Sequence, residues 1–184
     1  MAKKIFVTGG AGFIGSAFVR LVLEREADTE IVDYDALTYA GNPKNLEGID
    51  AARHVFVKGD ICDRKAVLDA LPAGTDAIFN FAAESHVDRS IHSADEFLRT
   101  NIIGTQVLLD AAREKGVRRF VQVSTDEVMG TLPEESDAFF TEDSPLAPNS
   151  PYAASKAAAE FVVRAARETH GVDAVVTRCG NNYG

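Results

Sequence analysis

The sequence predicts an α/β protein built on a parallel, doubly wound β-sheet, and three observations support that prediction. Short apolar runs rich in Val, Ile and Phe alternate with helical patterns along the whole chain. Most of these runs lack the alternation of apolar and polar residues that a half-exposed strand shows, so both faces of the sheet are expected to be covered. The strand–helix order implies right-handed crossovers between parallel strands. With 184 residues, the chain is long enough for one domain with a sizeable core.

Six strands and four helices are expected from these patterns. The strands are predicted at residues 4–8, 30–33, 54–59, 77–81, 120–125 and 174–178. The helices are predicted at residues 13–27, 65–71, 94–115 and 151–169. Pro151 after Asn149-Ser150 is a favourable first helical residue, and Gly116 after Lys115 is a suitable helix end.

Composition restricts the classes of partner. The chain carries 28 acidic and 19 basic residues, which gives a formal net charge of −9. Nucleic acids and anionic membranes need a basic face, so neither is expected as a partner. Cys62 and Cys179 are the only cysteines, and the four histidines show no metal-ligand spacing, so neither a disulfide framework nor a metal site is expected. No targeting signal or membrane-spanning run is recognised, and a reducing cytoplasm fits best.

The first expected strand runs into a glycine-rich turn that is typical of dinucleotide-binding proteins. The turn contains Gly10-x-Gly12-x-x-Gly15 and opens a helix, whose N-terminus favours the charge of a pyrophosphate. Asp35 lies about 20 residues after Gly15, just past the second strand, as the fingerprint requires. A carboxylate there would bind both ribose hydroxyls of NAD and repel the 2′-phosphate of NADP. Asp33 competes for the same role.

Two further strand ends are candidates for cofactor contacts. Asp60-Ile61 follows the third strand and could contact an adenine ring, although Asp60 could equally cap the helix that starts near Asp63. Phe81-Ala82-Ala83 ends the fourth strand, where small residues would let the backbone pass close to a nicotinamide. Core packing is the competing interpretation of that segment.

The residues best suited to chemistry are Ser124-Thr125-Asp126-Glu127 at the end of an apolar run, and Tyr152 with Lys156 at the start of a helix. Tyr152 and Lys156 are four residues apart, so they project from one helical face. An ammonium beside the phenol is expected to lower the tyrosine pKa and make it a usable base. Repulsion and burial are expected to keep one of the two carboxyl groups protonated as an acid while the other acts as a base. The alternative is that Asp126 and Glu127 only decorate a loop.

At these residues the chain resembles a known family. Gly9–Gly15 and Tyr152-x-x-x-Lys156 are similar to the extended short-chain dehydrogenase/reductases, which have an NAD(P)-binding Rossmann fold. The segments 38–42, 82–90, 124–128, 150–152 and 181–184 resemble the dTDP-glucose 4,6-dehydratases within them. Met129 and Gly180 depart from the usual Tyr and Ser. The resemblance implies that residues 1–184 are an NAD-binding Rossmann domain, and that a C-terminal substrate domain lies outside this chain.

The resemblance implies an internal redox cycle with NAD as cofactor and dTDP-glucose as substrate. Tyr152 would take the proton of the 4-hydroxyl, Glu127 would take the proton on carbon 5, and Asp126 would protonate the departing 6-hydroxyl. Thr125 would hydrogen-bond the oxygen on carbon 4, and Lys156 would hydrogen-bond the nicotinamide ribose. The substrate contacts implied are Ser85, Thr125, Asp126, Glu127 and Asn181. The cofactor contacts implied or inferred are Gly9, Gly12, Phe13, Ile14, Gly15, Asp35, Leu37, Thr38, Asp60, Ile61, Phe81, Ala82, Ala83, Ser85, Thr100, Tyr152, Lys156 and Asn182.

The family also implies a homodimer in which the helices at 94–115 and 151–169 form a four-helix interface. Ile102, Leu109, Phe161 and Val162 are candidates for its apolar faces, although burial against the sheet is the alternative for at least half of them. Two other functions stay open. One is a nucleotide-sugar epimerase or decarboxylase, against which the two carboxylates argue, and the other is a non-catalytic NAD-binding module.

Overall fold

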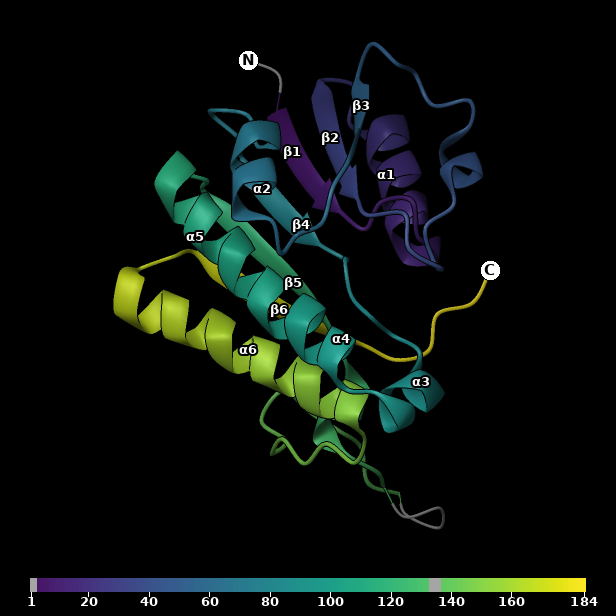
Figure 1. The fold of residues 1–184 in the computed structure, drawn as a ribbon, viewed down its shortest axis with the longest axis vertical. Helices are drawn as coiled ribbons and strands as arrows, with labels where there is room; N and C mark the ends of the chain where they lie inside the picture. Colours follow the sequence, from purple (N-terminus) through teal and green to yellow (C-terminus); the bar gives the residue numbers. More distant parts are fainter. Residues whose placement is uncertain (1–2, 133–136) are drawn as a thin grey trace.

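A single six-stranded parallel sheet forms the centre of the molecule. The structure is a computed structural model that describes residues 3–132 and 137–184. Every neighbouring pair of strands is parallel, and the order is β3-β2-β1-β4-β5-β6 (Figure 1). The predicted fold class is therefore confirmed. The strands are β1 Lys3–Thr8, β2 Thr29–Asp35, β3 His54–Lys58, β4 Ala77–Asn80, β5 Arg119–Thr125 and β6 Ala174–Cys179.

The strand order determines where a ligand can enter. From β1 the chain builds outward to β2 and β3, and it then crosses to β4 on the other side of β1. The connections that leave β1 and β4 therefore run to opposite faces of the sheet. In open α/β sheets, this reversal leaves a crevice at the carboxyl ends of the strands.

The longer helices cover both faces of the sheet. Helix α1 (Phe13–Arg25) lies on one face, while α2 (Arg64–Ala70), α5 (Thr105–Lys115) and α6 (Pro151–His170) lie side by side on the other (Figure 1). The Ser150 hydroxyl accepts from Ala153 N at 3.0 Å and caps α6, whose first residue is the expected Pro151. Gly116 and Gly171 end α5 and α6 with φ of 66° and 68°, which is the left-handed conformation that favours glycine.

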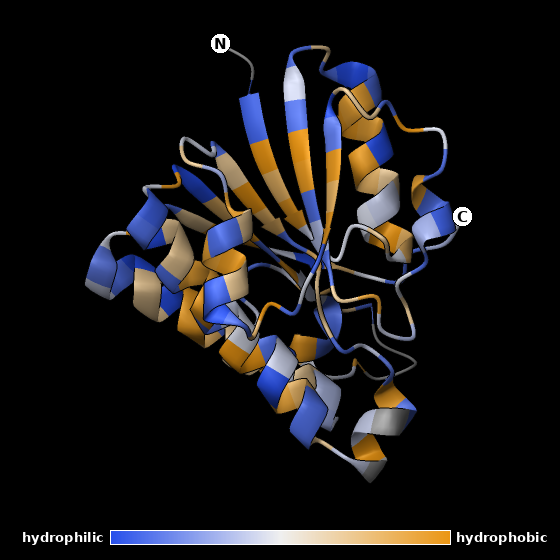
Figure 2. Cartoon of the chain, turned by 45° about the horizontal axis from the view of Figure 1, so that its top comes forward, coloured by the Kyte–Doolittle hydropathy of each residue, from blue (hydrophilic) through white to orange (hydrophobic). Residues whose placement is uncertain are grey.

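Two separate apolar clusters bury the two faces of the sheet. Neighbouring residues of β1 point in opposite directions, so Phe6 packs with α2, α5 and α6 while Val7 packs with Val19 and Leu23 of α1. Phe6 and Val7 are both fully buried. Figure 2 shows the same arrangement as apolar colouring along the middle of the strands. Burial on both faces explains why the strand sequences do not alternate.

The helix predicted at 94–115 is in fact three segments. It consists of α4 (Asp95–Phe97), a π-helical stretch η2 (Leu98–Gly104) and α5. The Thr105 hydroxyl donates to Asn101 O at 2.7 Å, and Gly104 packs directly on Ile61, where a larger side chain would collide. Wide turns of this kind are frequent at functional sites. Sequence periodicity cannot reveal it, because it depends on these tertiary contacts.

Three short elements were not predicted, because each is too short for its periodicity to be read. They are η1 (Pro43–Leu46), α3 (Val87–His92) and η3 (Asp126–Met129). Helices predicted at 13–27, 65–71 and 151–169 are present with ends within two residues. Over the described residues, no helix is long and apolar enough to span a membrane.

The four candidate dimer residues have different environments. Leu109 is 1% exposed and belongs to the core cluster beneath α5, so its assignment to an interface was wrong. Phe161 is 55% exposed, whereas Ile102 and Val162 are half-buried. Leu109 is buried because its position on α5 faces the sheet.

Candidate active site

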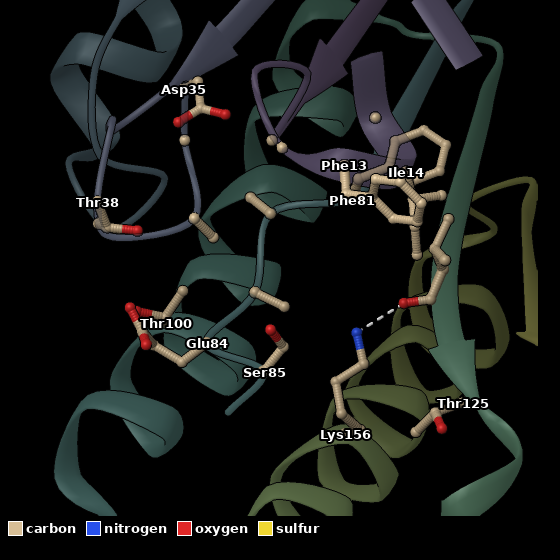
Figure 3. A pocket seen from close by; sticks show the side chains of 18 of the residues that line it. Phe13, Ile14, Asp35, Thr38, Phe81, Glu84, Ser85, Thr100, Thr125 and Lys156 are labelled. Atoms are coloured by element: carbon tan, nitrogen blue, oxygen red, sulfur yellow. Dashed lines mark hydrogen bonds between the residues drawn. The ribbon is translucent and has the colours of Figure 1, made fainter. Parts of the chain in front are cut away.

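A cavity of about 440 Å³ opens along the carboxyl edge of the sheet, and residues at the ends of all six strands line it. In Figure 3, Asp35 and Thr38 lie at one end of this cavity, and Lys156 and Thr125 lie at the other. The predicted site residues that line it are Gly9, Gly12, Phe13, Ile14, Gly15, Asp35, Thr38, Asp60, Ile61, Phe81, Ala82, Ala83, Ser85, Thr100, Thr125, Glu127, Tyr152, Lys156, Asn181 and Asn182. Leu37 and Asp126 do not line it.

The glycine turn after β1 is shaped by close backbone contacts. Gly9 has φ of +74°, and a Cβ atom there would lie 2.6 Å from the backbone nitrogen of Ala82. A Cβ on Gly12 would meet only Gly9 O, at 3.2 Å. Gly12 is also the N-cap of α1 and offers no side chain to the first N–H groups, and the first turn of α1 has no acidic residue. The turn therefore presents an open, electropositive helix end that suits a pyrophosphate.

The structure separates the two aspartates that compete for the ribose. Asp35 ends β2 and lines the cavity, and its Oδ2 accepts from Ala11 N at 3.0 Å while its Oδ1 accepts from Leu37 N at 2.7 Å. Asp33 is fully buried beneath Gly10, and its Oδ2 lies 3.4 Å from His54 Nε2. Burial raises the pKa of Asp33. Asp35 is therefore the carboxylate placed to meet a ligand in the cavity.

Leu37 supports this arrangement from outside the cavity. Its φ of +53° is left-handed, which is unusual for a branched residue, and its N–H is held by Asp35. Leu37 itself does not line the cavity, whereas Thr38, the next residue, does, and the predicted cofactor contact of Leu37 stays a prediction.

Asp60, Ile61 and Thr100 line the cavity near Thr38. The Oδ1 atom of Asp60 accepts from Cys62 N at 2.8 Å. The cap of α2 is Asp63, which accepts from Ala66 N, so the interpretation of Asp60 as that cap is wrong. Asp60 keeps its Oδ2 at the surface, where Arg99 lies 3.4 Å away.

The segment after β4 lines the cavity and also packs against α1. Phe81, Ala82 and Ala83 line the cavity, and the Phe81 ring also packs 5.1 Å from that of Phe18. Packing is therefore confirmed for Phe81, and the nicotinamide contact stays a prediction. Ser85 follows, and its N–H donates to the Tyr39 hydroxyl at 3.3 Å.

The Tyr152–Lys156 pair has different electrostatics from those expected. Lys156 is 5% exposed and donates to the Val123 carbonyl at 2.6 Å, the bond marked in Figure 3, and burial lowers its pKa to about 8. Burial, followed by the charge of Glu127, raises the pKa of Tyr152 to about 12. The expected lowering of the tyrosine pKa is therefore wrong for this structure. The Lys156 ammonium donates to the Val123 carbonyl, and the carboxylates that act on the Tyr152 phenol, of Glu127 and then Asp126, are negative.

The acidic residues form the short turn η3 directly after β5. The Thr125 hydroxyl accepts from Glu127 N at 3.2 Å and caps this turn, and it lies 3.3 Å from Asp126 Oδ1. Glu127 lines the cavity, and burial, then Asp126, raise its pKa. Asp126 points toward Gly180, where a Cβ atom would lie 3.4 Å from its Oδ2. The two carboxyl groups therefore occupy different environments, and the raised pKa belongs to Glu127, the residue assigned as base.

Sequence reasoning missed several residues of the cavity wall. The signal that could have found them is position, because each lies at or beside a strand end that already held a candidate. They are Tyr34, Ala36, Ala40, Gly41, Gly59, Glu84, Val123, Ser124, Cys179 and Gly180.

These features define a class. A parallel sheet in Rossmann order, a glycine turn at a helix N-terminus and a carboxylate after β2 make a dinucleotide-binding domain, and Tyr152 and Lys156 lie at the same edge of the sheet. Within that class, the chain belongs to the GDP-mannose 4,6 dehydratase family, whose sequence profile matches residues 6–184.

Relatives and solved structures agree with this membership. The chain is 56% identical to the low-salt glycan biosynthesis protein Agl12 of Haloferax volcanii over 98% of this chain and 57% of that protein. It is 55% identical to a dTDP-glucose 4,6-dehydratase of Streptomyces niveus, over 98% and 54% of the two chains. The chain thus spans about half the length of the curated relatives it matches.

Two crystal structures have a similar fold. The dTDP-glucose 4,6-dehydratase DesIV of Streptomyces venezuelae, solved with NAD bound, is 54% identical with a TM-score of 0.92, over 98% of this chain and 56% of that one. The UDP-glucose 4-epimerase of Thermus thermophilus, in complex with NAD, is 33% identical with a TM-score of 0.86, over the same shares.

Proposed function

We propose that this chain is the cofactor-binding and acid–base part of an NAD-dependent hydro-lyase that converts dTDP-glucose to dTDP-4-keto-6-deoxyglucose. The observation that carries the proposal is the convergence of the glycine turn, the Tyr152–Lys156 pair and the acidic turn on one cavity. Identities above 50% to dehydratases over nearly the whole chain support it. Because the matched relatives are about twice as long, the activity is proposed for the protein at its native length.

The residues present fit NAD. The open end of α1 would hold the pyrophosphate, Asp35 the adenosine ribose, and Lys156 the nicotinamide ribose, with Phe81-Ala82-Ala83 along the nicotinamide. When bound, NAD would take a hydride from carbon 4 of the sugar and return it to carbon 6. The Asp35 carboxylate lines the cavity and would repel the 2′-phosphate of NADP, which favours NAD over NADP.

The chain's own groups would then move the protons. Tyr152 takes the proton of the 4-hydroxyl, and Thr125 donates a hydrogen bond to the same oxygen. Glu127, whose raised pKa increases its proton affinity, takes the proton on carbon 5 and gives a proton back to carbon 5 when the hydride is returned to carbon 6. Asp126 protonates the 6-hydroxyl as it leaves, after its side chain turns from Gly180 toward the cavity. Ser85 and Asn181 hold the sugar.

The test is turnover by the protein purified at its native length. Incubation with NAD and dTDP-glucose should yield a 4-keto-6-deoxy sugar nucleotide, which chromatography and mass spectrometry identify. A 4-epimer of the substrate as the product would favour an epimerase, which the likeness to the Thermus thermophilus enzyme makes the second candidate. NAD binding without any turnover would leave a binding module.

Assembly and location belong to the same proposal. We place the protein in the cytoplasm as a homodimer, with Phe161 and the neighbouring faces of η2 and α6 at the interface. The residues that bind the nucleotide part of the sugar substrate are proposed to lie in a further domain beyond residue 184. Light scattering at micromolar concentration tests the dimer, and a monomer would contradict it.

A further inference from the structure

The acidic turn η3 is anchored from behind by a side chain that the proposed chemistry does not use. Arg178 lies on the edge strand β6, where it is paired in register with Ser124, one residue before Thr125. Its guanidinium extends to α6 and to the end of η3. The side chain is only 23% exposed, so its contacts are largely shielded from water.

The guanidinium contacts three separate elements. Its Nε lies 3.1 and 3.2 Å from the two carboxylate oxygens of Glu160, and its Nη2 donates to Glu160 Oε2 at 2.8 Å. Its Nη1 donates to Met129 Sδ at 3.6 Å and to the Glu142 carbonyl at 3.5 Å. The fork therefore joins α6, the last residue of η3 and the loop at 137–150.

The partners of Arg178 place it next to the reactive groups. Glu160 lies one helical turn after Lys156 and is 6% exposed. Met129 lies two residues after Glu127 and packs with Val128 and Ala157 in a small apolar cluster. The N–H of Ala147 donates to Val128 O at 2.9 Å and attaches the loop to the same turn.

We propose that Arg178 is a positioning residue that holds the Asp126–Glu127 turn in register with the Tyr152–Lys156 helix. The planar guanidinium of Arg178 can pair with Glu160 and contact Met129 and the Glu142 carbonyl at the same time. A lysine has a single point charge and can satisfy only the first of these contacts. This inference rests on the proposed function for its catalytic meaning, but the geometry it predicts can be measured without turnover.

The variants separate positioning from simple ion pairing. Arg178→Lys keeps the pair with Glu160 and loses the link to η3. Arg178→Met alone would leave a buried, unpaired Glu160, so it is made together with Glu160→Gln, which leaves the net charge unchanged. Met129→Leu keeps the volume and removes the sulfur acceptor. The matched control is Arg119→Met, which breaks the exposed pair with Asp173 at the opposite end of β5 and β6.

The first readout is the pKa of Glu127, which is measured by NMR titration of its side chain in each folded variant. Asp126 and the Tyr152 phenol are the titrating groups that face Glu127, and both are retained in every variant. If the turn loosens, Glu127 becomes better hydrated. Its pKa should then fall by about half a unit or more toward the ordinary value.

We expect this fall in Arg178→Lys and in the double variant, a smaller one in Met129→Leu, and none in Arg119→Met. NAD affinity, measured by calorimetry, should stay within about twofold throughout, since Arg178 lies outside the cavity wall. In the native-length protein, elimination should slow about tenfold while oxidation at carbon 4 is kept. An Arg178→Lys protein in which Glu127 titrates as in the parent would overturn the proposal, as would an equal fall in Arg119→Met. Absence of turnover in the parent would refute the proposed function, and the Glu127 titration would still decide the role of Arg178.

Discussion

The two ends of the cavity are built in different ways. At the glycine end, the shape is set by backbone: Gly9 approaches Ala82, and Gly15 approaches Gly9, so closely that side chains are excluded. At the acidic end, the shape is set by side chains from distant elements, with Lys156 on the Val123 carbonyl and Arg178 behind the turn. The glycine end therefore has a local sequence signature, whereas the acidic end depends on tertiary contacts.

The largest expected effect concerns the acidic end. In the native-length protein, Glu127→Gln should slow water elimination by about 10²–10⁴-fold, because the base for carbon 5 is lost. Oxidation at carbon 4 is proposed to depend on Tyr152 and not on Glu127, so reduced nicotinamide should accumulate, as followed by rapid-mixing absorbance. Normal release of 4-keto-6-deoxy product would contradict the assignment. Glu24→Gln, on the exposed side of α1, is the control.

A substitution at the glycine end should instead destabilise the fold through a steric clash. Gly9→Ala combines a left-handed backbone with a clash against Ala82 N, and together these should cost about 2–5 kcal/mol of unfolding free energy. Gly48 has a similar φ of +79° but nothing within 4 Å of an added Cβ, so Gly48→Ala should cost only about 1–2 kcal/mol. Urea unfolding of both variants measures the difference. Equal losses would show that the contact with Ala82 is unimportant.

A charge at the glycine end should govern the choice of cofactor. Asp35→Asn keeps an acceptor for Ala11 N or Leu37 N but removes the charge that repels a 2′-phosphate, so the preference for NAD over NADP should narrow by about tenfold. Asp35→Ala should narrow it as well and also weaken binding of both cofactors. Calorimetric titration of NAD and NADP into each protein measures the ratio. If the ratio does not change, the role shifts to a neighbouring residue.

The last expected effect is a change in stability at alkaline pH, and it concerns the acidic end. The pKa of Tyr152 is about 12 in the folded protein and 10.0 ordinarily, so the unfolded chain loses this proton first as the pH rises. Stability should therefore fall between pH 10 and 12, and Tyr152→Phe should fall less over that range. Urea midpoints across the range measure this, with Tyr183→Phe, at an exposed tyrosine, as the control. Identical pH profiles for Tyr152→Phe and the parent would contradict the raised pKa.

Local pattern was enough to predict most of the fold and the glycine end. The strands were found because apolar runs of Val, Ile and Phe need burial on both faces, and Asp35 was found because its spacing from Gly15 is set by one β-α-β unit. The π-helical stretch could not be read, since apolar periodicity does not distinguish it from the α-helices around it. The high pKa of Tyr152 was missed for a similar reason. It depends first on the burial of the phenol and then on the position of Glu127, and helical spacing fixes neither.

The pairing of β1 with β4 has a consequence for how the protein is made. Thr8 and Asn80 are 72 residues apart, yet their side chains share a 2.6 Å hydrogen bond inside the sheet. At a synthesis rate of about 5–20 residues per second, β1 is therefore made several seconds before β4, its second neighbour in the sheet. During that interval the edge of β1 that will pair with β4 has no partner, and the apolar side chains of β1 are accessible to chaperones or to a neighbouring chain. The loop after β1 is thus synthesised well before β4 but becomes rigid only after Asn80 has left the ribosome.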